Sequence, residues 1–176
     1  MSVIFVLGGA RSGKSRYAES LAVGEKHYVA TAQAFDDEMR ERIAVHKSQR
    51  GGAWETHETV LDLPEVLTQV MADDRFVLVD CLTLWLSNVM LAEQGWRGAL
   101  EGLLDCLRRA KGTVVLVSNE VGMGLVPETP LGRAFRDAQG VVNQRVAEVA
   151  DSVVFVAAGL PLALKGPLPK QPKASS

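Results

Sequence analysis

The sequence predicts a single α/β domain in which a mostly parallel central sheet is flanked by helices. Apolar, β-branched runs recur along the chain, and they are continuous rather than alternating, as in parallel strands covered on both faces. Segments with apolar residues at helical spacing separate these runs, and such alternation is typical of α/β folds. The expected strands are Val3–Leu7, Tyr28–Ala30, Phe76–Val79, Thr113–Val117 and Val153–Val156.

The first strand leads directly into a glycine-rich loop. Residues 8–15 read GGARSGKS and fit G-x-x-x-x-G-K-[ST], the phosphate-binding pattern of nucleotide triphosphatases and kinases. Gly8 and Gly13 would let backbone N–H groups approach a polyphosphate, with Lys14 at its β- and γ-phosphates. A chance glycine turn also fits the pattern, but the strand before it and the helical pattern after it favour nucleotide binding. The predicted nucleotide-binding residues of this loop are Gly8, Gly9, Ala10, Arg11, Ser12, Gly13, Lys14 and Ser15.

The second strand, Tyr28–Ala30, is followed by Thr31, Ala32 and Gln33. Ligands of open α/β sheets bind beyond the carboxyl ends of the strands, so we expect these three residues on the ligand side. Further along, Trp54–Glu58 is polar with an aromatic anchor. This segment fits a solvated loop and a loop whose acid accepts hydrogen bonds from a base or ribose equally well.

A histidine among cations follows the second strand. The intervening stretch begins with acids that can cap a helix, and His46 can share a face with Arg42 and Arg50, which lie four residues before and after it. Two interpretations remain open from this pattern: a solvated histidine on a surface helix, or a neutral, nucleophilic imidazole beside a polyphosphate. The other histidines, His27 and His57, lack such a cluster of basic residues and are expected to be structural or surface residues.

The third strand, Phe76–Val79, is followed by Asp80. An acid at the end of an apolar strand is the usual partner of a phosphate loop, where its carboxylate binds Mg²⁺ directly or through water. We therefore expect Asp80 and the Ser15 hydroxyl near the metal ion. The next segment, Cys81–Leu91, is predicted to be a largely apolar helix in which Trp85 belongs to the core or to an interface.

The fourth strand ends in a polar, glycine-containing segment, Ser118–Gly124, which we expect to form a loop on the ligand side. The guanine-reading pattern N-K-x-D is absent, which argues against a regulatory GTP switch. Apolar stripes at helical spacing predict two further helices. Their members are Leu100, Leu103, Leu104 and Leu107 in the first, and Leu131, Phe135, Ala138, Val142 and Val149 in the second.

Composition narrows the class of protein. The 176 residues suit one domain, residues 1–165, and residues 166–176 are rich in proline, lysine and serine and predict a flexible tail. A net charge of −2 gives no nucleic-acid or membrane footprint, and no apolar run is long enough to span a bilayer. The first residues lack the basic region of a signal peptide, and Cys81 and Cys106 lack metal-ligand spacing. We therefore expect a cytoplasmic protein with two free, buried thiols.

Motifs along most of the chain resemble one family. They are, in order, GGARSGKS, YVATAQ, DDEM-x-x-RI-x-x-HK, W-E-T-x-E, VLVDCLT-x-W, SNEVGMG-x-VPE and RAFRD-x-x-G-x-VNQR. The set is similar to the bifunctional adenosylcobinamide kinase / adenosylcobinamide-phosphate guanylyltransferase family of cobalamin biosynthesis. The resemblance runs from Val3 to about Ala158, and SNEVGMG and DDEM-x-x-RI-x-x-HK are its most distinctive parts.

The resemblance implies a RecA-like P-loop domain assembled as a homotrimer, with Mg²⁺ as cofactor. It implies phosphorylation of adenosylcobinamide by ATP or GTP, followed by GMP transfer from GTP to adenosylcobinamide-phosphate with release of pyrophosphate. The position that accepts GMP in the family corresponds to His46. Beyond the glycine-rich loop, the implied nucleotide contacts are Thr31, Ala32, Gln33, Lys47, Ser48, Gln49, Arg50, Glu58 and Asp80.

Two other functions fit parts of the pattern. One is a kinase for the corrinoid alcohol that performs no guanylyl transfer, and it would tolerate the loss of His46. The other is a nucleotide-binding regulatory or assembly protein, which would bind partners in a nucleotide-dependent way without turning over cobinamide.

Overall fold

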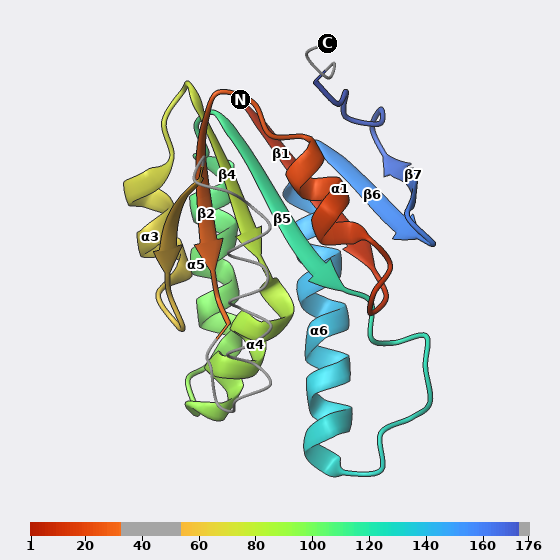
Figure 1. Cartoon of the computed structure of the whole chain (residues 1–176). Helices are drawn as coiled ribbons and strands as arrows, with labels where there is room; N and C mark the ends of the chain where they lie inside the picture. The colour runs from red at the N-terminus through yellow and green to blue at the C-terminus, as the bar shows by residue number, and fades with distance from the viewer. Residues whose placement is uncertain (33–53, 173–176) are drawn as a thin grey trace.

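The computed structural model describes residues 1–32 and 54–172, which form a mostly parallel seven-stranded sheet with the order β3-β2-β4-β5-β1-β6-β7 (Figure 1). The strands β1 to β6 all run parallel to one another, and β7 pairs antiparallel with β6. The strands are β1 (Ser2–Gly8), β2 (Glu25–Ala30), β3 (Trp54–Glu58), β4 (Arg75–Asp80), β5 (Thr113–Asn119), β6 (Ser152–Ala157) and β7 (Leu160–Lys165). All the strands expected from the sequence are present, and the predicted α/β class is confirmed.

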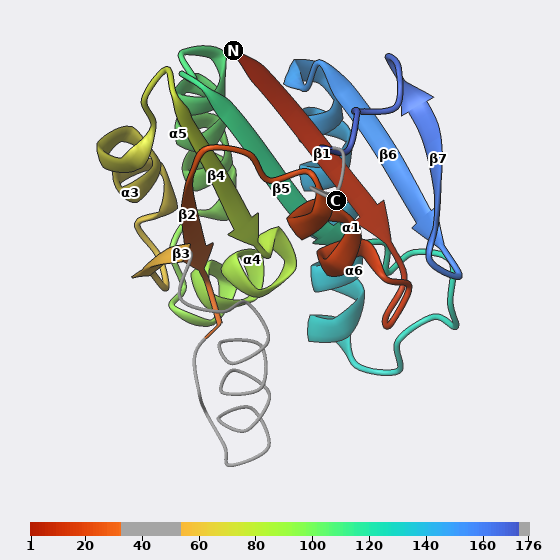
Figure 2. The ribbon, with the colours of Figure 1, turned by 45° about the horizontal axis from the view of Figure 1, so that its top comes forward.

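Helices cover both faces of the sheet. One face carries α1, and the other carries α3, α5 and α6, as Figures 1 and 2 show. The fifth described helix, α4, begins just beyond the end of β4. The helices are α1 (Lys14–Ser20), α3 (Leu63–Val70), α4 (Leu82–Leu91), α5 (Trp96–Arg108) and α6 (Pro130–Val149).

The core consists of two apolar clusters, one on each face of the sheet. Phe5 of β1 belongs to the cluster under α3, α5 and α6, whereas its neighbours Ile4 and Val6 belong to the cluster under α1. Successive side chains of a strand point to opposite faces, so a strand buried on both faces must be apolar at every position. This explains the continuous apolar runs of the sequence.

The two edge strands differ from the sequence-based expectation. The segment Trp54–Glu58 is not a loop: β3 pairs in parallel with β2, from Lys26 opposite Trp54 to Ala30 opposite Glu58. It escaped detection because all five residues of this edge strand are at least partly exposed, and the strand therefore lacks a continuous apolar run. β7 was also missed, because Leu160, Leu162 and Leu164 are all more than half exposed and the strand is defined by its pairing with β6.

The predicted helices are present, with one difference in packing. The leucine stripe of α5 is fully buried, and Trp85 of α4 is buried with its indole N–H donating to the carbonyl oxygen of Leu61 at 2.9 Å. In α6 only the later part of the stripe packs inward: Ala138 and Val142 are buried, whereas Leu131 is 58% exposed. The start of α6 extends past the sheet (Figure 1), so Leu131 covers no core, whereas Phe135, one turn later, is partly buried against it.

Three further expectations can be compared with the fold. Cys81 and Cys106 are free and buried, as predicted. Among the described residues, no helix has the length and apolar character needed to cross a membrane. Residues 166–172 contain no helix or strand, but the carbonyl oxygen of Pro167 accepts a hydrogen bond from Ser152 Oγ at 3.3 Å, and Gln171 lines a hollow beside α1. The domain boundary at residue 165 stays a prediction.

Candidate nucleotide-binding site

The strand registers align the carboxyl ends of the parallel strands. Gly8 pairs with Asn119, and Asp80 and Glu58 both pair with Ala30. The loop after β1, the acid that ends β4 and the polar segment after β5 therefore lie along one edge of the sheet. This is the edge at which open α/β sheets bind ligands.

Two glycines fix the shape of the loop between β1 and α1. A Cβ atom on Gly8 would lie 2.5 Å from both Ser12 Oγ and the carbonyl oxygen of Val156, so no larger residue fits there. Gly13 precedes the first residue of α1 with φ of 93°, in the left-handed region that favours glycine. The sequence pattern thus corresponds to real steric requirements.

Neighbouring segments hold this loop from both sides. The backbone N–H of Gly159, in the turn between β6 and β7, donates to the carbonyl oxygen of Ser12 at 2.8 Å. On the other side, the N–H of Glu120 donates to the carbonyl oxygen of Gly8 at 3.1 Å. The Ser12 hydroxyl is buried and has no hydrogen-bond partner among the described residues. The loop is therefore fixed in position and offers an unmatched polar group.

Lys14 is held over the loop. Its Nζ donates to the carbonyl oxygen of Gly9 at 3.0 Å. Burial lowers the pKa of Lys14, and the nearby Cys81 and Asp80 oppose this shift. A partly desolvated ammonium group interacts more strongly with a phosphate than one in bulk water, because the local dielectric constant is lower.

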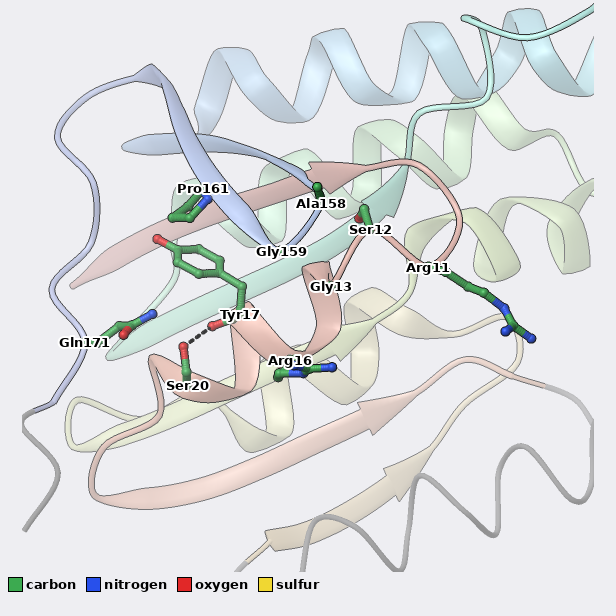
Figure 3. Close-up of a pocket in the computed structure, with 10 residues that line it drawn as sticks. All are labelled: Arg11, Ser12, Gly13, Arg16, Tyr17, Ser20, Ala158, Gly159, Pro161 and Gln171. Carbon is green, nitrogen blue, oxygen red and sulfur yellow. Dashed lines mark hydrogen bonds between the residues drawn. The ribbon is translucent and has the colours of Figure 1, made fainter.

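Two open hollows flank the loop and α1. One, of about 440 Å³, carries three cationic side chains, Arg11, Lys14 and Arg16, against the single carboxylate of Glu19, which suits a polyanion. The other, of about 420 Å³, lies between α1 and the β6–β7 turn (Figure 3). Its lining residues are Arg11, Ser12, Gly13, Arg16, Tyr17, Ser20, Ala158, Gly159, Pro161 and Gln171.

Asp80 lies at the end of β4, as the sequence predicts. Its Oδ2 accepts a hydrogen bond from the hydroxyl of Tyr28 at 3.0 Å, and the peptide bond that follows it, to Cys81, is cis. The tyrosine fixes the carboxylate at the site edge. A carboxylate and the hydroxyl of Ser15 are hard oxygen donors of the kind that Mg²⁺ prefers.

Thr31 makes hydrogen bonds within the protein that connect neighbouring elements of the fold. Its hydroxyl donates to the carbonyl oxygen of Cys81 at 2.7 Å and accepts from the N–H of Cys81 at 2.9 Å. Asn88 of α4 donates to the carbonyl oxygen of Thr31 at 2.9 Å. These bonds join the ends of β2 and β4 to α4, and the expected nucleotide contact of Thr31 stays a prediction.

A buried polar network, which the sequence did not reveal, supports the end of β5. Ser118 Oγ donates to Asn143 Oδ1 at 2.8 Å, and Gln139 Nε2 donates to both of those oxygens at 3.0 and 2.9 Å. Asn143 Nδ2 donates to the carbonyl oxygen of Asn119 at 3.2 Å, and the N–H of Asn119 donates to Thr83 Oγ1 at 2.8 Å. The motif VNQR, which contains Asn143, was the available signal, but its partners Ser118 and Asn119 lie 25 and 24 positions away in the chain.

The structure places the predicted site residues unequally. The loop residues 8–15, Ala32 and Asp80 lie at the carboxyl edge. Glu58 ends β3, and β2, β4 and β5 lie between that strand and β1, so it is not beside the loop. Gln33, His46, Lys47, Ser48, Gln49 and Arg50 lie outside the described residues.

Comparison with known proteins gives a consistent family. A family model described as cobinamide kinase / cobinamide phosphate guanyltransferase matches residues 4–164. The bifunctional adenosylcobalamin biosynthesis protein CobP of Pseudomonas aeruginosa is 48% identical, and the match covers 92% of this chain and 96% of that protein. The bifunctional adenosylcobalamin biosynthesis proteins CobU of Salmonella typhimurium and Escherichia coli are 42% and 38% identical, each over 93% of this chain and 99% of the relative.

Solved structures share the fold at low identity. An ATPase of a bacterial type III secretion system superposes with a TM-score of 0.55 at 14% identity, over 92% of this chain and 56% of that one. The P4 protein of bacteriophage phi6, in complex with ADP, gives 0.52 at 15% identity, over 91% and 52%. At such identities the likeness concerns the fold alone, and it agrees with the predicted phosphate-loop architecture.

Proposed function

The chain belongs to the cobinamide kinase / cobinamide phosphate guanyltransferase family, and from this premise we propose that it catalyses both reactions in adenosylcobalamin biosynthesis. In the first, ATP or GTP phosphorylates adenosylcobinamide. In the second, GMP passes from GTP to adenosylcobinamide-phosphate, giving adenosylcobinamide-GDP and pyrophosphate. The observation that carries the proposal is the fixed, cation-lined phosphate loop in a chain that matches this family over residues 4–164.

The kinase step needs positioning and charge neutralisation. The loop amides and Lys14 would hold the β- and γ-phosphates, with Arg11 and Arg16 adding positive charge around the same hollow. The oxygens of Ser15 and Asp80 suit Mg²⁺, which when bound offsets negative charge on the phosphates. The Tyr28 hydroxyl would keep the Asp80 carboxylate oriented toward the site edge.

The guanylyl step requires a nucleophile, and we assign it to His46. An unprotonated ring nitrogen attacks the α-phosphorus of GTP, the bond from that phosphorus to the bridging oxygen breaks, and pyrophosphate leaves. A phosphate oxygen of adenosylcobinamide-phosphate then attacks the same phosphorus and releases the histidine. This is covalent catalysis through a phosphoramidate, and the cations Arg42, Lys47 and Arg50 lie close to His46 in the sequence.

Assembly and substrate binding can be tied to the exposed apolar residues around the start of α6. Met123, Leu125 and Val126 in the segment before α6 are 81%, 96% and 64% exposed, and a mostly apolar hollow of about 280 Å³ lies between α4 and the start of α6. Exposed apolar patches of this kind mark interaction sites. We assign this region to subunit contact in a cytoplasmic homotrimer and to the apolar parts of the corrinoid.

Covalent labelling tests the proposal. The protein is incubated with Mg²⁺ and GTP radiolabelled at the α-phosphate, then denatured, and the chain is assayed for label. We expect a label that acid removes and alkali does not, absent from His46→Ala and present in the matched control His57→Ala. His46→Ala should still phosphorylate cobinamide.

Each other outcome has a definite meaning. Absence of label with intact phosphorylation of cobinamide would reduce the protein to a kinase. Nucleotide binding without turnover of cobinamide in either reaction would favour a regulatory or assembly role.

A further inference from the structure

A cluster of two histidines and a glutamate lies on the edge strands, apart from the nucleotide site. His27 belongs to β2, and Glu55 and His57 belong to β3, the outermost strand on that side. His27 pairs with Glu55 in the register, and His57 pairs with Val29, so the three side chains point to the same face. In the sheet, β4 and β5 lie between these two strands and β1, which carries the phosphate loop.

The three side chains converge through their donor atoms. His27 Nδ1 lies 3.0 Å from His57 Nε2. The carboxylate of Glu55 approaches both rings, with Oε2 at 3.8 Å from His27 Nδ1 and Oε1 at 3.6 Å from His57 Nε2. One donor atom from each residue can be chosen so that all three lie within 4.8 Å of one another.

These separations are close to those that a tetrahedral zinc site requires. Zinc–nitrogen and zinc–oxygen bonds of about 2.0–2.2 Å at tetrahedral angles place two ligand atoms about 3.3–3.6 Å apart. The two imidazole nitrogens, at 3.0 Å, lie a few tenths of an ångström closer together than this, and the Glu55 carboxylate approaches them through different oxygens, Oε2 at 3.8 Å from His27 and Oε1 at 3.6 Å from His57. Small side-chain rotations would place the three donor groups at bonding distance from one metal ion.

The ring nitrogen of His27 that faces away from His57 contacts a carboxylate, as is usual for metal-binding histidines. His27 Nε2 lies 2.8 Å from Glu25 Oε1, so its proton is donated to that carboxylate and Nδ1 is left as an acceptor facing His57. Arg75 Nε in turn lies 3.0 Å from the same oxygen of Glu25 and balances its charge. A carboxylate on the far nitrogen of a ligating histidine fixes the tautomer and raises the basicity of the ligand.

Exposure gives an ion access to the cluster. His27 is 2% exposed, whereas His57 and Glu55 are 24% and 64% exposed. The buried ring provides a fixed ligand, and the two outer ligands face solvent. Without an ion, the N–H at His57 Nε2 can donate to His27 Nδ1. A divalent cation would bind the other tautomer of His57, with the proton on its Nδ1, so that Nε2 offers a lone pair.

We propose that His27, Glu55 and His57 form a binding site for a divalent transition-metal ion of the zinc class, with water as the fourth ligand. Two imidazoles and a carboxylate are a zinc-type donor set, distinct from the oxygen donors of the Mg²⁺ site. The ion would join edge strand β3 to β2. Its binding energy would add to the stability of the folded chain, because the unfolded chain does not hold the three ligands together.

Zinc titration of the full, untagged chain tests this site. After treatment with a chelator and its removal, Zn²⁺ is titrated in competition with a chromophoric chelator. We expect one ion per chain and a higher midpoint of thermal unfolding with Zn²⁺ than without it. With Co²⁺ as the probe, the visible absorption should be that of a tetrahedral complex.

Substitutions at the ligands and at the residue that contacts His27 should weaken Zn²⁺ binding to different degrees. His57→Ala and Glu55→Gln, at the more exposed ligands, should weaken Zn²⁺ binding by at least 100-fold while leaving the far-ultraviolet circular dichroism unchanged. Glu25→Gln should weaken it about 10–100-fold, as loss of a second contact does. The matched controls Glu93→Gln, at an exposed glutamate in the turn after α4, and His46→Ala should bind Zn²⁺ as the unmodified chain does.

Three results would overturn the proposal. One is the absence of stoichiometric zinc binding by the unmodified chain. Another is Zn²⁺ affinity unaffected by His57→Ala and Glu55→Gln, and the third is loss of binding in His46→Ala, which would place the ion elsewhere. Loss of guanylyl transfer bears on the proposed function, whereas zinc affinity and thermal midpoint bear on this site, so the two can fail separately.

Discussion

The phosphate loop and the end of β5, both at the carboxyl edge of the sheet, are held in shape in different ways. The phosphate loop takes its shape from consecutive residues, through the missing side chain of Gly8 and the left-handed backbone of Gly13. The end of β5 is supported by side chains from three separate elements: Thr83 of α4, Ser118 of β5, and Gln139 and Asn143 of α6. The geometry of the loop suits the binding of a ligand, whereas the network supports the end of β5.

The difference shows where function and stability reside. A change in a loop side chain that faces the ligand should remove activity and spare the fold. A change in the buried network should weaken the fold first, because it leaves polar groups without partners in the interior. Three substitutions test this separation, and a fourth, at the N-terminal cap of α6, gives the scale of a small effect on stability.

The largest effect is expected for Lys14→Ala. Removing the cation that we propose to hold the phosphates should lower kcat/KM for phosphorylation of cobinamide by about 10³-fold, or roughly 4 kcal/mol. The midpoint of urea unfolding should stay the same, since the ammonium group makes its hydrogen bond within the loop, to Gly9. Lys111→Ala, at an exposed lysine, is the control. A large loss of stability in Lys14→Ala would contradict the assigned role.

Gly8→Ala should destabilise the protein by about 3 kcal/mol. The added Cβ would collide with Ser12 Oγ and with the backbone oxygen of Val156, and overpacking of this kind costs about 1–3 kcal/mol. Gly9→Ala is the matched control, because its Cβ would meet no atom within 4 Å. Urea unfolding of both variants measures the difference. Equal stabilities would show that the loop shape does not depend on Gly8.

Asn143→Ala should cost about 2 kcal/mol of unfolding free energy. It leaves the buried donors of Ser118 and Gln139 without their shared acceptor, and an unsatisfied buried group costs about 1–3 kcal/mol. Gln144→Ala, at the exposed neighbouring position, should change the free energy little. A variant with unchanged stability and greatly reduced activity would give Asn143 a direct role at the ligand and remove the contrast with the loop.

The smallest effect is expected for Thr129→Ala. The Thr129 hydroxyl caps α6 by accepting from the N–H of Gly132 at 3.1 Å, and loss of such a cap costs about 1 kcal/mol. Thr129→Ser retains the oxygen and should recover most of the loss. Thermal unfolding of the two variants provides the measurement. An unchanged midpoint in Thr129→Ala would show that the start of α6 does not contribute to stability.

The sequence alone determined the phosphate loop, the class of fold and the family. Eight consecutive residues carry the steric and charge requirements of the loop, and strands buried on both faces must be apolar at each position, so both features can be read locally. The tail, the Mg²⁺ ligands and His46 stay at the level of prediction, and His46 lies outside the described residues.

Only the tertiary structure decided which distant residues meet. The strand β3 is defined by its pairing with β2. The start of the α6 stripe is exposed because that helix extends past the sheet, and the structural role of Thr31 follows from its bonds to Cys81. His27 and His57 lie 30 positions apart and carry no motif, yet the register brings their nitrogens to 3.0 Å. Such contacts depend on strand order and register, and these follow from the packing of the whole chain rather than from any one segment.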